Sequence, residues 1–446
     1  MSSMTGHLRL VASSVLLLAL AGCSLFTPGD GTQSKAPTDK STPTVSLTTS
    51  ASPSPSPAVV IDPAAAPVTP QFFGVHDHDP LSWPDAPVGS LRAWDSGVTW
   101  RLIETSPGSF DFSLLDATVE KAEANGSDVL LVLGQTPEFH ATDPASESFY
   151  GAGASSPPRL AAWKRYVREV AERYAGRPVV LQVWNEANVA GFWSGTPAQM
   201  ARLTKAAYDV LATVLPRPTL VAPALVTRLI GQRAWIDDFW AQQVDGAQVA
   251  DFVDVVSLQL YPEADGTPES SMELLAAIRV VLARHGVTKP IWNTEVNYGL
   301  TGLPVSPTAT KQQIANVART YLLNAANRVE RVYWYGWDQQ QIVDTLTTYA
   351  DGVTVTPAGR AFRTVQRWME GATVQSCGAD ALGTYLCTLT YDGGVRRVYW
   401  NPSVEASVEL PSGSTRLQRL AGDAHAIPTT SNLEVDGVPL MVESPN

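Results

Sequence analysis

The chain has 446 residues, and its 43 acidic side chains outnumber its 31 Lys and Arg side chains, which gives a formal net charge of −12 at pH 7. This balance, without a basic patch, argues against binding to the phosphate backbone of a nucleic acid. The patterns Gly-x-Ser-x-Gly, His-Glu-x-x-His and the phosphate-binding loop are absent, which argues against the esterase, zincin and nucleotide triphosphatase classes.

The first 22 residues have the features of a secretory signal peptide. Arg9 precedes an apolar run over residues 10–20, and small residues come directly before Cys23. The run is too short to favour a membrane-spanning helix. Its end, Leu-Ala-Gly-Cys, resembles the lipobox of bacterial lipoproteins, so we expect Cys23 to be lipidated and to form the mature N-terminus. The alternative is an ordinary signal peptide in which this cysteine is incidental.

Residues 23–70 form a second region, rich in Ser, Thr and Pro and including the alternating Ser-Pro stretch 52–57. Few apolar side chains are available there to offset the entropy of ordering, so we expect a disordered tether. A recruitment motif for a partner is the alternative interpretation. About 375 residues remain, which is enough for a barrel and a small accessory domain.

Between residues 71 and 370, short β-rich runs alternate with stretches that have apolar residues at helical spacing. The eight expected strands span residues 72–76, 90–94, 128–133, 179–183, 219–222, 253–260, 290–295 and 331–337. The expected helices span residues 114–124, 159–174, 197–215, 234–243, 270–285 and 309–327. This alternation predicts an α/β fold, a (β/α)8 TIM barrel. Residues 138–158 are too polar and glycine-rich for a core, and we expect them to shape the rim of a cleft.

Residues 371–446 have a different pattern. Runs at 385–391 and 395–400 flank Asp-Gly-Gly, which is a hairpin signal. Further short runs follow at residues 407–410, 417–420 and 438–442. These features predict a small antiparallel, β-sandwich-like domain. Cys377 and Cys387 lie close in sequence in a chain that we expect to be exported, so we expect them to form a disulfide.

Two of the expected barrel strands end in glutamates. The apolar, β-branched run 179–183 suits a strand buried on both faces, and Trp184, Asn185 and Glu186 follow it. The seventh strand likewise runs into Glu295. Parallel barrel strands converge at their C-terminal ends, so we expect these two carboxyl groups to face each other. Other glutamates are interpreted as solvated surface charges, namely Glu104, Glu138, Glu147 and Glu263.

Trp184-Asn185-Glu186, followed by a second glutamate three barrel strands later, resembles clan A of the glycoside hydrolases, which are (β/α)8 enzymes. The resemblance covers roughly residues 71 to 370 and is strongest to family 39, the β-xylosidase-like group, with families 5 and 30 as neighbours. It implies a retaining mechanism with Glu186 as the acid/base and Glu295 as the nucleophile. It also implies that the C-terminal domain braces the barrel, with carbohydrate binding as the alternative.

Several further residues are expected to contact the substrate. The resemblance implies that Arg92 lies beside the nucleophile and that Trp337 is a platform for a sugar ring, although Arg92 could instead brace the barrel and Trp337 could be core. Tyr261 is expected to hydrogen-bond Glu295, and Asn185 to contact the sugar 2-hydroxyl. The remaining residues expected to bind substrate are His76, Gln135 and Trp193.

His76-Asp77-His78-Asp79 has the composition of a metal cluster, but no third ligand group with recognisable spacing appears elsewhere. The resemblance to clan A implies that a polar residue at the end of the first strand touches the substrate, so we interpret His76 as a sugar contact, and we expect no metal and no cofactor.

The sequence predicts a glycosidase that acts on an extracellular oligo- or polysaccharide and is lipid-anchored to the outer face of the bacterial cell membrane. No nucleic acid and no obligate protein partner are expected. The alternative is a catalytically inactive surface lipoprotein that binds glycan.

Overall fold

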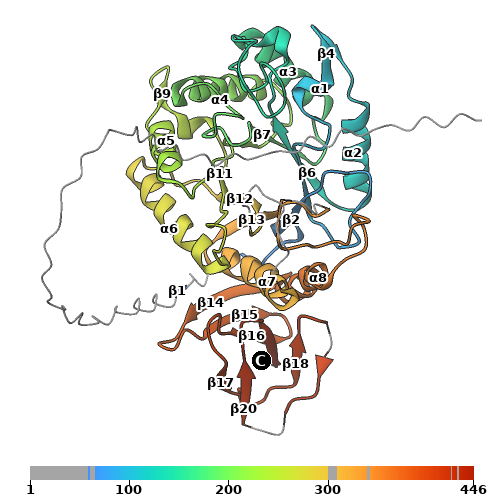
Figure 1. Cartoon of the computed structure of the whole chain (residues 1–446), viewed down its shortest axis with the longest axis vertical. Helices are drawn as coiled ribbons and strands as arrows, with labels where there is room; N and C mark the ends of the chain where they lie inside the picture. Colours follow the sequence, from blue (N-terminus) through green and yellow to red (C-terminus); the bar gives the residue numbers. More distant parts are fainter. Residues whose placement is uncertain are drawn as a thin grey trace, which may run out of the picture.

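The computed structural model describes residues 59–60, 66–299, 309–338, 342–422, 424–428 and 431–445. The predicted signal peptide, Cys23 and most of the predicted tether therefore lie outside the described residues. Within the described part of the chain, no helix combines the length and apolar character needed to cross a membrane. Figure 1 shows a helix-lined barrel followed by a β-sheet domain at the C-terminus.

Eight parallel strands form the barrel. In chain order they are β2 (Phe73–His76), β3 (Ser90–Ala93), β6 (Asp128–Leu133), β7 (Val179–Val183), β8 (Leu220–Val221), β11 (Val256–Gln259), β12 (Ile291–Val296) and β13 (Val329–Trp334). The sheet runs from β11 through β13, β2 and β7 to β8. Parallel bridges from Val221 to Val255 and from Val226 to Gln259 join its two outer strands. The predicted (β/α)8 barrel is confirmed.

Helices cover the outside of this barrel. They are α2 (Ser113–Ala124), α3 (Leu160–Arg173), α4 (Pro197–Leu211), α5 (Ile230–Trp240), α6 (Pro268–Arg284), α7 (Thr310–Ala326) and α8 (Pro357–Met369). A capping box explains where α4 begins, because Thr196 and Gln199 each bond the other's backbone N–H. The helix expected at residues 234–243 begins earlier, at Ile230, and α8 was not among the predicted helices.

Short helices and strands lie in the connections between the barrel strands and helices. They are η1 (Pro70–Phe72), α1 (Trp100–Ile103), β4 (Glu104–Ser106), β5 (Ser109–Phe110), η2 (Glu138–His140), β9 (Gln243–Val244), β10 (Ala247–Gln248) and η3 (Val249–Phe252). β4 pairs with β5, and β9 pairs with β10, so each pair forms a small hairpin outside the barrel.

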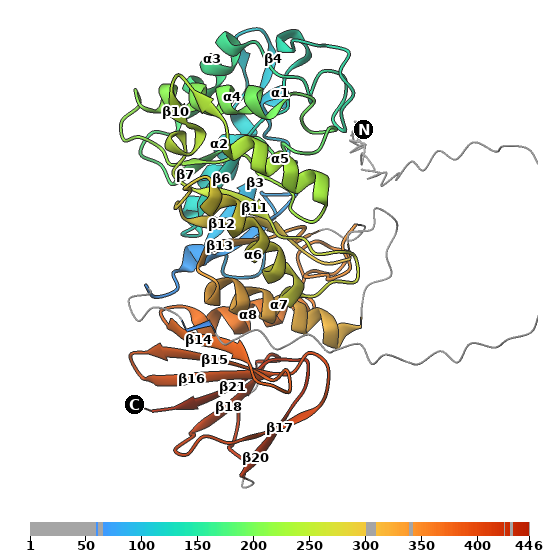
Figure 2. The ribbon, with the colours of Figure 1, turned by 90° about the vertical axis from the view of Figure 1, so that its left-hand side faces the viewer.

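The C-terminal domain is antiparallel, as predicted (Figure 2). Its larger sheet contains β14 (Thr373–Ala379), β15 (Tyr385–Tyr391), β16 (Gly394–Trp400), β18 (Arg416–Arg419), β19 (Ala424–His425) and β21 (Leu440–Ser444). A smaller layer pairs β17 (Ala406–Glu409) with β20 (Asn432–Val435). Leu433 and Val435 of that layer share an apolar cluster with Leu417 and Leu440 of the larger sheet. Cys377 and Cys387 face each other across β14 and β15, and the predicted disulfide is confirmed.

The end of the predicted tether is part of the folded structure. Residues Val59–Val60 form β1, which pairs antiparallel with the edge of β14. Val68 then exchanges backbone hydrogen bonds with Gly371 and Ala372, where the barrel joins the C-terminal domain. The expectation of disorder is therefore wrong for these residues. The physical reason is that the open edge of β14 offers unpaired backbone groups that an extended segment can satisfy.

The C-terminal sheet packs on α7 and α8, and its junction with the barrel is buried and polar in part. Glu269 at the start of α6 accepts hydrogen bonds from Arg319 of α7 and, at 3.1 Å, from the indole N–H of Trp400 in β16. The indole N–H of Trp368 in α8 donates to Gln418 of β18 at 2.8 Å. One continuous apolar core runs through barrel and sheet, so the C-terminal domain braces the barrel.

Candidate active site

The chain leaves β7 in a strained conformation that aims Glu186 into the barrel mouth. Trp184 and Glu186 have φ angles of 66° and 44°, in the left-handed region that residues other than glycine seldom adopt. Such residues cost about 1–3 kcal/mol each and persist where their surroundings hold them. Trp184 is fully buried; its backbone N–H donates to Leu133, and its indole N–H donates to the Phe192 carbonyl at 2.8 Å.

Glu295, near the end of β12, is almost fully buried and surrounded by donors. Arg92 Nη1 lies 2.5 Å from Oε2, and Gln259 Nε2 donates to the same oxygen at 2.9 Å. The Tyr261 hydroxyl donates to Oε1 at 2.7 Å. Three donors, one of them a guanidinium, stabilise the anionic form of a carboxylate. The surroundings of Glu295 thus suit a carboxylate that accepts hydrogen bonds on both oxygens.

Glu186 has the opposite environment. Burial raises the pKa of its carboxyl to about 8, and the negative charge of Glu295 acts in the same direction, while the guanidinium groups of Arg228 and Arg92 oppose the shift. The structure records no hydrogen-bond donor to the Glu186 side chain among the described residues. The mouth of the barrel therefore holds one carboxyl group that keeps its proton near neutral pH and one that is surrounded by hydrogen-bond donors, which is the division of roles that an acid and a nucleophile require.

Arg92 connects the site across the barrel. Its side chain is fully buried at the end of β3, and besides Glu295 it donates from Nη2 to Asn185 Oδ1 at 2.6 Å. Its Nε donates to Gln182 Oε1 at 3.2 Å. Gln259 Nε2 also reaches Asn185 Oδ1, at 3.1 Å. The predicted residues Arg92, Asn185 and Tyr261 are therefore brought together with Glu295.

His76, at the end of β2, belongs to a chain of hydrogen-bonded histidines and aspartates beside Glu295. Its Nε2 lies 2.5 Å from Asp95 Oδ1, and its Nδ1 lies 4.0 Å from Glu295 Oε2. His78 Nε2 approaches Asp95 Oδ2 at 3.5 Å, while its Nδ1 lies 2.8 Å from Asp338 Oδ1. Although burial opposes both shifts, Asp95 and Asp338 raise the pKa of His78 to about 11, and the two imidazoles hold the pKa of Asp95 well below its usual value.

The structure supplies the third potential metal ligand that the sequence did not reveal. Ligand atoms of His76, His78 and Asp95 all lie within 4.8 Å of one another. The hydrogen bonding nevertheless disfavours an ion at this place. Arg92 Nη1 faces His76 Nδ1 at 3.3 Å, so Nδ1 accepts and the ring proton sits on Nε2, directed at Asp95. The cluster is better described as a charge network, with histidine protons between carboxylates.

The other residues predicted to contact the substrate are buried. Gln135, just past β6, has a φ of 61° and accepts a hydrogen bond from Thr99 at 2.9 Å. Trp193 is 3% exposed and packs edge-on against Trp184, and Trp337 is fully buried against Phe362. Neither indole presents an open face to solvent, and substrate contact by these three residues stays a prediction.

The long connection after β6 brings Tyr150 towards the site. The Tyr150 ring lies edge-on to Trp94, with 5.7 Å between ring centroids. Burial raises the pKa of its hydroxyl, and the charges of Asp95, Glu186 and Glu295 raise it further. Backbone hydrogen bonds from Phe149 to Gly191 and from Ser194 to Ser155 tie this connection to the one after β7. It does line the rim of the site.

Glu104 is not a surface charge, which corrects our interpretation. It is fully buried and accepts hydrogen bonds from the Trp100 indole at 2.6 Å, His140 Nε2 at 2.9 Å and Arg165 Nη2 at 3.0 Å. These contacts anchor α1 and the rim connection. The other three glutamates interpreted in the same way, Glu138, Glu147 and Glu263, are exposed.

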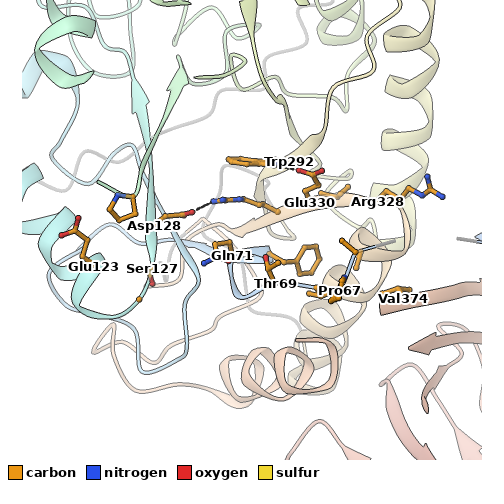
Figure 3. A pocket seen from close by; sticks show the side chains of 18 residues that line it. Pro67, Thr69, Gln71, Glu123, Ser127, Asp128, Trp292, Arg328, Glu330 and Val374 are labelled. Atoms are coloured by element: carbon orange, nitrogen blue, oxygen red, sulfur yellow. Dashed lines mark hydrogen bonds and ion pairs between the residues drawn. The ribbon is translucent and has the colours of Figure 1, made fainter. Parts of the chain in front are cut away.

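A separate cavity of about 890 Å³ lies at the opposite end of the barrel (Figure 3). Asp128, Trp292 and Arg331, which line it, come from the first residues of β6, β12 and β13. The Arg331 guanidinium pairs with Asp128 at 2.7 Å and lies 4.2 Å from the centroid of the Trp292 ring. The N-terminal end of such a barrel contributes to stability rather than catalysis, so this cavity is not the candidate active site.

No family model matches the sequence, and no curated protein matches it. Solved structures do match the fold. A family 39 glycoside hydrolase from Bacteroides cellulosilyticus WH2 superposes with a TM-score of 0.66 at 16% identity, covering 84% of this chain and 81% of that one.

A monomeric β-xylosidase from Caulobacter crescentus CB15 gives a TM-score of 0.59 at 15% identity, covering 85% of this chain and 98% of that one. A family 30 endoxylanase from Clostridium papyrosolvens C71 gives 0.57 at 15% identity, with 86% and 98% covered. The chain therefore shares the (β/α)8 fold of the family 39 and family 30 glycoside hydrolases, in agreement with its sequence resemblance to clan A.

Proposed function

We propose that the protein is a retaining glycoside hydrolase that works by double displacement, with Glu295 as nucleophile and Glu186 as acid/base. The observation that carries this proposal is the contrast between the two carboxyl groups. Glu295 is held by three donors, whereas the pKa of Glu186 is raised to about 8 by burial and by the charge of Glu295. A retaining enzyme needs one carboxyl group of each kind, on opposite sides of the scissile bond.

In the first step, the Glu295 carboxylate attacks the anomeric carbon while Glu186 gives its proton to the departing oxygen. The product is a covalent glycosyl-enzyme. Formation of that ester removes the negative charge of Glu295, which is one cause of the raised pKa of Glu186. Glu186 then becomes a base that takes a proton from water, and the water oxygen displaces Glu295 from the sugar.

Asn185 is suited to the sugar 2-hydroxyl. Its Oδ1 accepts from both Arg92 and Gln259, which fixes the orientation of the amide. Its Nδ2 has no partner among the described residues, so this N–H group is available to donate to a substrate. Such a contact strengthens in the transition state. We propose that His76 also contacts the sugar, because it lies next to both Arg92 and Glu295.

The related folds suggest where the search for a substrate begins. The matched structures include proteins described as a β-xylosidase, an endoxylanase and a glucosidase. We therefore expect hydrolysis of an aryl β-xyloside or β-glucoside, or of a plant or bacterial polysaccharide built from such sugars. Glu295→Gln serves as the matched control, because it removes the nucleophile's charge with little change in shape.

A catalytically inactive glycan-binding protein is the alternative, and the same experiment separates the two. Turnover that disappears in Glu295→Gln supports the hydrolase. Saturable binding of a polysaccharide without turnover of any substrate in the panel would instead identify a binding protein.

We further propose that the enzyme is exported and tethered to the outer face of the bacterial membrane through a lipid on Cys23. The Leu-Ala-Gly-Cys sequence and the Ser/Thr/Pro-rich segment after it support this placement. Cys23→Ala should move the protein from the membrane fraction to the soluble fraction. Unchanged fractionation would contradict the proposal.

A further inference from the structure

The segment that follows β8 is fastened to the loop that carries Glu186. Ala187 N–H donates to the Ala224 carbonyl, and Ala224 N–H donates to the Trp184 carbonyl, each at 3.1 Å. The side-chain amide of Asn188 then forms two hydrogen bonds with the backbone of Val226: it donates to the carbonyl at 2.7 Å and accepts from the N–H at 3.0 Å. Hydrogen bonds therefore fix residues 224 to 226 to the loop that carries Glu186.

The same segment is also fixed to β11, the strand that carries Gln259. Gln259 N–H donates to the Leu225 carbonyl at 2.9 Å, and the Thr227 hydroxyl donates to the Gln259 carbonyl at 3.0 Å. Arg228 is the next residue. Arg228 therefore directly follows a segment that is hydrogen-bonded both to the loop that carries Glu186 and to β11, and it lies at the rim of the catalytic mouth.

Arg228 is partly exposed, and its guanidinium has no ion-pair or hydrogen-bond partner in the described part of the chain. Its charge nevertheless reaches Glu186, whose pKa it lowers. An unpaired cation therefore works against the carboxyl group that must retain a proton. This conflict would disappear if a bound anion neutralised the guanidinium during the reaction.

Arg228 is not one of the groups that hold the nucleophile. Those donors are Arg92, Gln259 and Tyr261, which together satisfy both oxygens of Glu295. Arg228 belongs instead to the segment that is hydrogen-bonded to the loop carrying Glu186. In a retaining glycosidase the acid lies next to the departing oxygen, so this rim is where the leaving group is held.

We propose that Arg228 binds an anionic substituent, a carboxylate or a sulfate, on the leaving-group side of the scissile bond, so that acidic saccharides are the preferred substrates. This inference rests on the proposed hydrolase activity. A guanidinium is suited to the role because its planar fork matches the two oxygens of such an anion. Neutralising its charge would also remove one of the interactions that lower the pKa of Glu186.

The test compares aryl glycosides that share one glycone accepted by the wild type. Their nitrophenyl leaving groups carry a carboxylate, a sulfate or, as a matched neutral group, a carboxamide. We expect the wild type to prefer the charged leaving groups by roughly tenfold or more in kcat/KM. We expect Arg228→Gln to abolish this ratio and Arg228→Lys to retain part of it. Carboxylate and sulfate are compared directly, and a preference for either supports the proposal.

Arg233→Gln is the control, because it removes the same charge from the first turns of the nearby helix α5. This variant should keep the wild-type ratio of kcat/KM between charged and neutral leaving groups. The preference should also weaken as salt concentration rises. A ratio that Arg228→Gln leaves unchanged, or a wild-type preference for the carboxamide, would overturn the inference while the hydrolase remains. Failure of the wild type to hydrolyse any glycoside would overturn the proposed function itself.

Discussion

Arg92 and Glu295 form a buried ion pair, with 2.5 Å between Nη1 and Oε2, at the centre of the barrel mouth. The same guanidinium donates from Nη2 to Asn185, the residue directly before Glu186. One rigid planar group thereby fixes the position of Glu295 relative to the loop that carries Glu186. This geometry, rather than either glutamate alone, defines the site.

Replacing Arg92 by Lys should lower kcat/KM by roughly 100-fold, because one ammonium nitrogen cannot reproduce the planar fork that contacts Glu295, Asn185 and Gln182 from three separate nitrogens. Loss of a buried partner also costs stability, so the melting temperature should fall. Steady-state kinetics on an aryl glycoside and a thermal melt measure the two effects. Wild-type kinetics in Arg92→Lys would show that the bridge is dispensable.

The activity should decline as the pH rises through about 8. The acid works only while protonated, and burial together with the charge of Glu295 raises the pKa of Glu186 to about 8. The profile of kcat/KM against pH tests this expectation. With a substrate whose aryl group departs without protonation, Glu186→Ala should lose this alkaline limb, and a limb that persists there would assign it to another group.

Removing the disulfide should lower stability without lowering activity. Cys377 and Cys387 are 10 residues apart and link β14 to β15, far along the chain from the barrel mouth. Closing a short loop contributes on the order of 2–3 kcal/mol to the free energy of unfolding. The double substitution Cys377→Ala and Cys387→Ala should lose this amount in denaturant unfolding and keep wild-type kcat. A reductant should destabilise the wild type similarly and leave the variant unaffected.

The junction between the barrel and the C-terminal sheet should depend on Glu269. This carboxylate accepts from Arg319, which is 1% exposed, and from Trp400. Glu269→Ala would leave Arg319 buried without its partner, a change that costs about 3–5 kcal/mol. Glu273→Ala, in the same helix at an exposed position, is the control and should change unfolding by less than about 0.5 kcal/mol. Equal effects of the two substitutions would deny this ion pair a bracing role.

The parts of the structure that sequence reasoning predicts are those encoded locally. The β-rich run before Glu186 and the extended run into Glu295 are visible as strands, and a barrel necessarily brings strand ends to one mouth. That Glu186 and Glu295 come to the same mouth of the barrel therefore follows from the positions of their strands, whereas their proposed roles rest on the resemblance to clan A and on the surroundings of each carboxyl group. The helices are recognised equally well where the helical spacing is clear, as for α4, which is predicted to begin at residue 197 and begins at Pro197 in the structure.

The groups that complete the site depend on long-range geometry instead. Asp95 and Asp338 meet at His78 although 243 residues separate them in the sequence. No local signal marks them, because their positions follow from how the barrel closes. The left-handed backbone conformation of Glu186 could not be predicted from the sequence either, because such conformations are expected at glycine and this position is a glutamate. Pairing of β1 with β14 joins segments more than 300 residues apart, beyond the range of any sequence periodicity.

The products formed with azide test the assignment of the two glutamates most directly. In Glu186→Ala, the glycosyl-enzyme still forms from an activated aryl β-glycoside but lacks a base to activate water. Azide needs no base, so it should restore turnover and yield the β-glycosyl azide, with retained configuration. In Glu295→Ala, azide would replace the nucleophile and yield the α-azide. NMR spectroscopy of the anomeric proton distinguishes the two. Swapped configurations would reverse the roles of Glu186 and Glu295, and an inverted sugar product from the wild type would contradict the retaining mechanism itself.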